Sequence, residues 1–153
     1  MKTEITTCQI CGREIKAKGG VIAHHGYTRP GDGWQTASCF GARYQPYEQG
    51  CDAIAAAIDS VNLYIETTTK ALTEILACPP EVVSVWNNFH KTTQKFQRPE
   101  NFDFPRWNGS FADKYACAYA RKIDQLKSGI KAAEKQVVFL TERGRNWSKQ
   151  FED

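Results

Sequence analysis

Apolar and polar residues alternate with a helical rhythm in the middle of the chain, between residues 51 and 77. Apolar or small residues recur there in steps of four and three, the spacing of a heptad seam on one face of a helix. The positions are Ile54, Ile58, Val61, Ile65, Thr68, Leu72 and Ile75. Cys78-Pro79-Pro80 follows, and proline cannot continue a helix. The pattern predicts a helix over 51–77.

A second seam lies between residues 111 and 147. Its positions are Tyr119, Ile123, Leu126, Ile130, Ala133, Val137, Leu140, Gly144 and Trp147. Asp113 is expected in the first turn of this helix, with Ser110 as its N-cap, because both residue types favour a helix start.

The two predicted helices carry opposite charge. Residues 51–77 hold four acids and one lysine, a net charge of −3, whereas residues 111–149 hold nine bases and four acids, a net charge of +5. Two seamed helices of opposite charge favour a long antiparallel coiled-coil hairpin. A globular helix bundle is the alternative within one chain, and seams that pair between chains would give a homodimer.

The connector between the helices predicts a small β-structure. VVSVW and TQKFQ are typical of short strands, joined through NNFHKT as a β-hairpin. An aromatic loop, 101–109, follows it. We therefore expect an insertion over 79–110 that forms the tip of the helical hairpin.

Residues 1–50 have another character, because glycine, cysteine and turn signals separate short β-prone runs such as VIAHHGY. The sequence predicts an α+β, mainly α protein. A small lobe with a β-hairpin (1–50) precedes the helical hairpin (51–153).

Cysteine and histidine in the first fifty residues indicate a metal site. Cys8 and Cys11 have the two-residue gap of a zinc knuckle, and Cys39 supplies a third thiolate. Thirteen residues separate His25 from Cys11 and also from Cys39. A Cys₃His set suits tetrahedral Zn²⁺. Cys51 is the alternative to Cys39 as a ligand.

The adjacent histidines, His24 and His25, leave a choice. If VIAHHGY is one strand, the two side chains point to opposite faces, so only one of them can reach the metal. On this alternation His25 is preferred, because it shares a face with Val21 and Tyr27.

Composition places the chain in the cytoplasm. The sequence contains no apolar run long enough for a membrane span, and its first residues lack the pattern of a signal peptide. The six cysteines are then expected to be thiols or metal ligands. The net charge of +3 is too small to require a nucleic-acid partner.

The first fifty residues resemble a treble-clef-like zinc finger, with the knuckle CQIC, the hairpin KGGVIAHHGY and Cys39 before a helix. The larger pattern, GxIAHHGYxRPGxGWQTxSCFGA, is similar to small uncharacterised proteins of phages and plasmids. The resemblance implies a zinc finger of mobile-element origin. The usual treble clef takes its last two ligands from the helix start, whereas here Cys39 alone does so.

Some treble-clef folds are His-metal nucleases, in which a hairpin histidine is the general base. That mechanism needs a further Asn or His ligand on the next helix, and FGARYQPYEQGCD offers neither. Four protein ligands also leave no open metal position. We therefore expect a protein that is not an enzyme and keep the nuclease as a remote alternative.

Two surfaces combine bases with aromatic residues, a mixture that can hold phosphates and stack on bases. In the lobe they are Arg13, Lys16, Lys18, Arg29, Trp34 and Arg43. In the tip they are Trp86, Lys91, Lys95, Phe96, Arg98, Arg106 and Trp107. The alternative is that these aromatics, above all Trp34, Phe40, Trp86, Phe96 and Trp107, form local cores.

The function expected from the sequence is that of a zinc-binding interaction protein. Its finger and tip would engage a host protein or a nucleoprotein complex, including one of host defence. The alternative is a nucleic-acid-binding zinc finger in replication, recombination or transcription.

Overall fold

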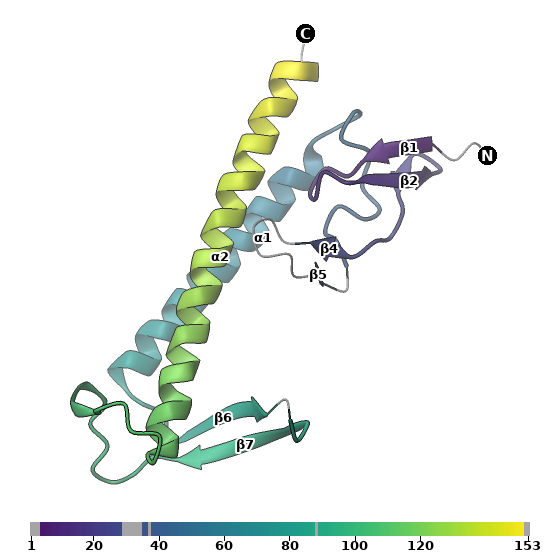
Figure 1. Ribbon diagram of the computed structural model, residues 1–153. Helices are drawn as coiled ribbons and strands as arrows, with labels where there is room; N and C mark the ends of the chain where they lie inside the picture. Colours follow the sequence, from purple (N-terminus) through teal and green to yellow (C-terminus); the bar gives the residue numbers. More distant parts are fainter. Residues whose placement is uncertain (1–3, 29–34, 37, 88, 152–153) are drawn as a thin grey trace. The chain divides into compact units, whose positions relative to one another are not determined.

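The computed structural model describes residues 4–28, 35–36, 38–87 and 89–151 (Figure 1). Within these ranges the chain forms two α-helices, α1 (Asp52–Ala77) and α2 (Lys114–Phe151), and three small antiparallel sheets. The predicted α+β class is confirmed. Neither described helix has an apolar stretch that could cross a membrane.

Helix α1 begins and ends within one residue of its prediction. The seam from Ile54 to Ile75 is confirmed as its inward face, because each of the seven positions is buried or half-buried. At its start the Gln9 side chain takes the place of a cap, since Gln9 Oε1 accepts the Ala53 N–H at 2.9 Å.

Helix α2 begins later than predicted. Asp113 lies before the helix and caps it, with Oδ1 accepting the Ala116 N–H at 2.9 Å. The expectation that Ser110 is the cap is wrong, because Ser110 Oγ accepts the Ala112 N–H in the turn before the helix. The nine seam positions from Tyr119 to Trp147 are again buried or half-buried.

The chain packs into two compact units, and each helix runs through both. Unit 1 comprises Met1–Tyr64 and Ala132–Asp153, and unit 2 comprises Ile65–Lys131. The boundary expected after residue 50 separates the lobe from the helices. The packing instead groups the lobe with the start of α1 and the end of α2 in one unit.

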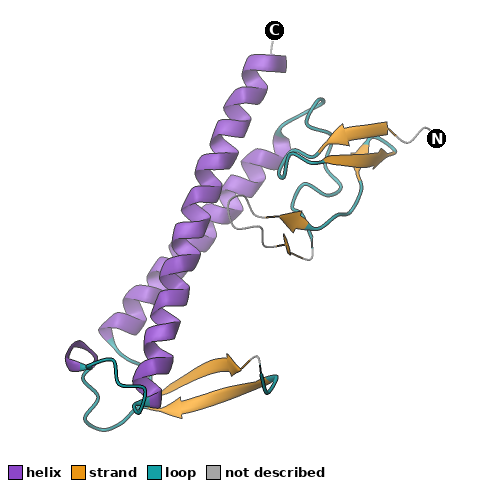
Figure 2. Cartoon of the chain, in the orientation of Figure 1, coloured by secondary structure: helices purple, strands orange, loops and turns teal. Residues whose placement is uncertain are grey.

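Unit 1 contains a three-stranded sheet in the order β1 (Glu4–Thr7), β2 (Glu14–Lys18), β3 (Val21–Ile22). A two-stranded ladder, β4 (Tyr27–Thr28) with β5 (Gln35–Thr36), lies in the same unit (Figure 2). VIAHHGY is not one strand, because the ladder with β2 ends at Ile22. On its other edge β3 hydrogen-bonds with the chain at Arg43 and Tyr44. After Ile22 the chain leaves the sheet, and both histidines lie outside any strand.

The core of unit 1 joins the knuckle to both helices. Ile10 and Ile22 pack with Ile54 and Ala57 of α1 and with Leu140 of α2, all of them buried. In this unit the start of α1 therefore packs against the last third of α2.

Unit 2 contains the predicted hairpin, β6 (Val82–Asn87) paired with β7 (Thr92–Gln97), and a short 3₁₀ turn, η1 (Phe104–Arg106). Its core is formed by Val83, Tyr115, Tyr119 and Ile123. The Tyr119 hydroxyl donates to the Ile75 carbonyl at 2.7 Å, which joins α2 to the last turn of α1. Trp86 stays outside this core, with 54% of its surface exposed.

Candidate metal centre

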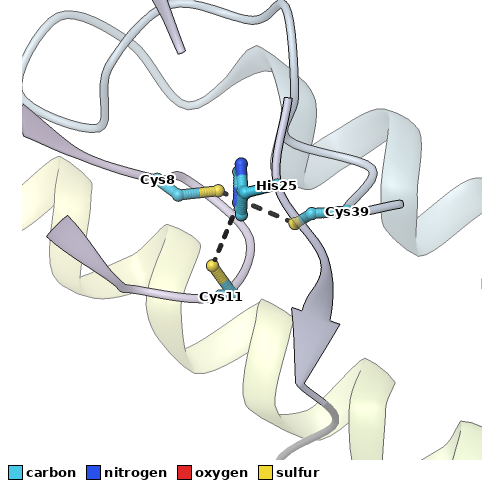
Figure 3. A group of neighbouring side chains, drawn as sticks. All are labelled: Cys8, Cys11, His25 and Cys39. Carbon is cyan, nitrogen blue, oxygen red and sulfur yellow. Dashed lines mark hydrogen bonds between the residues drawn. The ribbon is translucent and has the colours of Figure 1, made fainter. Parts of the chain in front are cut away.

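Four side chains of unit 1 converge, and they are the four that spacing predicted as ligands. The sulfurs of Cys8, Cys11 and Cys39 and a ring nitrogen of His25 all lie within 4.8 Å of one another (Figure 3). Cys8 and Cys39 are buried and Cys11 and His25 half-buried. The alternative ligand Cys51 is not among them, and neither is His24, whose side chain is exposed.

Two of the distances between the donor atoms are close to those of a tetrahedral zinc site. Zn–S bonds of about 2.3 Å and Zn–N bonds of about 2.0–2.1 Å give tetrahedral edges of about 3.8 Å between sulfurs and about 3.6 Å between sulfur and nitrogen. Cys8 Sγ and Cys39 Sγ are 3.8 Å apart, and Cys11 Sγ and His25 Nε2 are 3.4 Å apart. None of the six cysteines forms a disulfide in the structure.

The knuckle turn holds Cys8 and Cys11 at this spacing. Strand β1 ends at Thr7, and the chain turns back into β2 through Cys8–Gly12. The Cys8 N–H donates to the Arg13 carbonyl at 2.9 Å, and the Gly12 N–H donates to the Cys8 carbonyl at 3.1 Å. Gly12 has φ +71°, a conformation that favours glycine, which explains why glycine follows CQIC.

His25 is oriented by its own backbone. Its Nδ1 lies 2.8 Å from the Ala23 carbonyl oxygen, and because a carbonyl can only accept a hydrogen bond, Nδ1 is the protonated nitrogen that donates to it. Nε2 is then the unprotonated nitrogen that faces the thiols, the usual arrangement of a histidine ligand. The preference for His25 is therefore met, although the strand alternation on which it depended is absent.

The same backbone links the last two ligands, because the Cys39 N–H donates to the His25 carbonyl at 2.8 Å. Cys39 lies before α1 in sequence, separated from Asp52 by a turn-rich segment. This backbone hydrogen bond therefore holds His25 and Cys39 next to each other, as the knuckle turn does for Cys8 and Cys11.

The three thiols lie so close together that their hydrogen bonds shift their pKa values in opposite directions. Hydrogen bonds from the Cys39 and Cys8 side chains lower the pKa of Cys11, whereas the hydrogen bond to Cys11 raises the pKa of Cys39. The Arg13 guanidinium lies beside the Cys11 sulfur, and this contact raises the pKa of Arg13. Its Nε and Nη2 are buried without a hydrogen-bond partner in the described structure.

Arg13 therefore has a different place from the one predicted. We expected it on a phosphate-binding surface, but it packs against the thiols. If the three thiolates and a neutral imidazole held a divalent ion such as Zn²⁺, the centre would carry one negative charge, which the guanidinium of Arg13 would balance.

Three residues that sequence reasoning missed support the centre. Gln9 is fully buried, and its Nε2 donates to Gln45 O and to Asp52 Oδ1, each at 2.9 Å. Arg143 of α2 donates from Nε to Gln9 O at 2.6 Å and from Nη2 to Cys8 O at 3.0 Å. A Cβ on Gly41 would lie 2.5 Å from Cys8 Sγ, so no larger residue fits there.

The other basic residues expected on the lobe surface lie away from the centre. Lys16, Lys18 and Arg43 are exposed, whereas Arg29 and Trp34 lie outside the described residues. Phe40 does not cover the metal site as a core residue, because 43% of it is exposed and it stacks on Tyr44 with ring centres 5.8 Å apart.

The residues expected on the tip surface divide into two groups. Lys91, Lys95 and Trp86 are exposed, but Arg98 donates to the Pro79 carbonyl and Arg106 pairs with Asp103 at 3.2 Å. Phe96 packs against the unit 2 core, and Trp107 stacks on Phe104. A local core thus includes Phe96 but not Trp86.

Comparisons of the chain with family models, with curated proteins and with solved structures gave no match.

Proposed function

We propose that this chain is a zinc-stabilised binding protein in which the metal is structural. The observation that carries the proposal is the donor set of Cys8, Cys11, His25 and Cys39, whose donor atoms lie within 4.8 Å of one another, with two of the distances close to the edges of a zinc tetrahedron. Zinc would join three loop segments that are too short to hold one another by apolar burial alone, and its binding energy would become folding energy.

Several features support a structural role over a catalytic one. Three thiolates and an imidazole fill a tetrahedron, which leaves no position for water or a phosphate oxygen. His24, the residue that a nuclease would use as general base, is exposed and outside the donor set. Asp52, the acidic residue at the start of α1, is engaged in a hydrogen bond with Gln9 and is not part of the donor set.

The binding role belongs to exposed surface. Bases and aromatic rings that no core requires remain accessible in unit 2, among them Trp86, Phe111 and Lys95. Such groups suit contact with a protein or a nucleoprotein complex, because exposed Trp often carries much of the binding energy at interfaces and basic side chains bind phosphates. In this proposal zinc maintains the fold and the surface binds.

Elemental analysis of the purified full chain tests the metal. We expect about one zinc per chain, kept by Cys51→Ser, Cys78→Ser and His24→Ala and largely lost by Cys11→Ser and His25→Ala. A chain without stoichiometric zinc, or equal losses in the ligand and control variants, would contradict the proposal.

An incubation with plasmid DNA and added divalent metal tests catalysis. We expect no cleavage. Cleavage that disappears in His24→Ala while zinc is retained would replace the structural role with a nuclease.

A further inference from the structure

A groove lies in unit 2 between residues of the β6–β7 hairpin and the first turns of α2. It consists of a cavity of about 340 Å³ and a second of about 460 Å³ that share Phe111, Cys117 and Arg121. We call it the tip groove. The residues that give it its chemistry are Trp86, Phe96, Trp107, Phe111, Lys114 and Arg121.

The groove exists because the core covers only the base of the hairpin. The strand register pairs Val83 with Phe96 and Val85 with Gln94, which places these four residues on one side of the sheet. Val83 is buried and Val85 and Phe96 half-buried, but Gln94 is exposed. The same side of the hairpin therefore passes from core to open groove along its length.

Phe111 and Trp86 line the groove without belonging to the core, whereas Phe96 also packs against the core. Phe111 is 90% exposed and Trp86 54% exposed, and Trp107 lies at the other end. An exposed aromatic ring contributes to stability or affinity only when a partner covers it and removes it from water. Several rings along one groove provide successive surfaces on which bases can stack.

The charged residues that line the groove all come from α2. They are Lys114, Arg121 and Asp124, a net charge of +1, whereas the lining residues of the hairpin are uncharged. Lys114 and Arg121 line the groove two helical turns apart, about 10.5 Å along the axis, and neither forms an ion pair within the described part of the chain.

We propose that the tip groove binds single-stranded nucleic acid, with bases on the aromatic rings and phosphates at Lys114 and Arg121. This inference rests on the proposed binding role and names its partner. The α2 side of the groove runs from Lys114 to Ser128, about 21 Å, which suits a short site of about four nucleotides. An acidic peptide would match the charge, but it would not use a row of stacking surfaces.

Fluorescence anisotropy with labelled oligothymidine and oligouridine of about twelve nucleotides tests this assignment. Phe111→Ala should weaken binding about fivefold or more, whereas Phe89→Ala, an equally exposed ring outside the groove, should change it less than about twofold. The two oligonucleotides show whether DNA or RNA is preferred.

Salt dependence provides the second readout. Between about 50 and 200 mM salt, Arg121→Gln should reduce the slope of log K against log salt by about 0.7, the value for one phosphate contact to a single strand. Lys127→Gln removes the same charge from α2 outside the groove and should leave the slope unchanged.

The assignment is overturned if neither oligonucleotide binds, if Phe111→Ala and Phe89→Ala behave alike, or if a duplex of equal length binds as tightly. Displacement by an acidic aromatic peptide with no oligonucleotide binding would identify a protein partner instead. The groove lies within residues 82–128 and the zinc ligands within 8–39, so zinc content and oligonucleotide binding report separately on the two proposals.

Discussion

Arg143 donates a hydrogen bond of 2.6 Å to the carbonyl of Gln9, the residue between the first two metal ligands, 134 positions away in sequence. Its guanidinium also lies 4.0 Å from the centre of the Tyr47 ring. One side chain of α2 thus holds the outside of the knuckle. The centre is therefore supported by a helix that supplies no ligand.

Replacing Arg143 with methionine should lower the free energy of unfolding by about 2–4 kcal/mol, because two hydrogen bonds from a charged donor are lost and two carbonyls are left without it. Denaturant unfolding of the zinc-loaded chain measures the effect. Arg145→Met, at an exposed position on the same helix, should cost less than about 0.5 kcal/mol. Equal losses in the two variants would show that the contact contributes nothing particular.

Gly41→Ala should disturb the metal centre, because the added Cβ would overlap Cys8 Sγ. We expect a loss of about 1–3 kcal/mol and weaker zinc retention against a chelator. Gly50→Ala is the matched control, since its Cβ would meet the end of the Gln45 side chain at 3.3 Å, which can move away. Normal zinc retention in Gly41→Ala would mean that the loop before α1 adapts more easily than its packing indicates.

Arg13→Gln should weaken zinc binding about tenfold, because it removes the positive charge beside an anionic centre. Competition with a chromophoric chelator measures the affinity. Arg13→Lys should restore part of the loss, and Lys16→Gln should have little effect, since Lys16 is exposed on β2. An unchanged zinc affinity in Arg13→Gln would show that the charge of Arg13 does not contribute to metal binding and that the side chain only packs against the thiols.

Tyr119 should make unit 2 sensitive to alkaline pH. Burial raises the pKa of Tyr119 in the folded state, whereas the unfolded value is about 10. The neutral phenol therefore stabilises the fold fully below pH about 10, and this contribution is lost as the pH rises through the folded pKa. Stability measured against pH should fall less steeply in Tyr119→Phe than in Tyr64→Phe, in which an exposed ring is changed.

Removal of zinc should affect the two units unequally. All four ligands belong to unit 1, so a chelator should increase amide hydrogen exchange in residues 4–28 while residues 65–131 keep their protection. Mass spectrometry of peptic fragments resolves the two regions. Uniform exchange across the chain after chelation would show that the helices transmit the loss through both units.

The parts of the fold that depend on local periodicity could be predicted from the sequence. Steps of four and three from Ile54 to Ile75 gave the bounds of α1 to within one residue, and the alternation around Val83 and Phe96 gave the hairpin. The start of α2 was misplaced because Ser110 and Asp113 are both good caps, and only the path of the chain decides between them.

The four residues of the candidate metal centre could be predicted because cysteine and histidine in a short glycine-rich segment have few other uses. The supporting contacts could not. Gln9, Gly41 and Arg143 are ordinary residues in sequence, and their roles arise from contacts with distant parts of the chain. Arg13 resembles a phosphate-binding residue until its position beside the Cys11 sulfur is known.

The order of synthesis separates the parts of the metal lobe in time. The ribosome makes Trp147 a hundred residues after Tyr47, whose carbonyl accepts the Trp147 indole N–H. At about 5–20 residues per second this is a delay of about 5–20 s. During that delay the nascent chain has every thiolate and the imidazole needed to capture an ion, but neither Arg143 nor Leu140 to close over it. Capture of the ion can therefore come first in the cell, with the last turns of α2 sealing a centre that is already assembled.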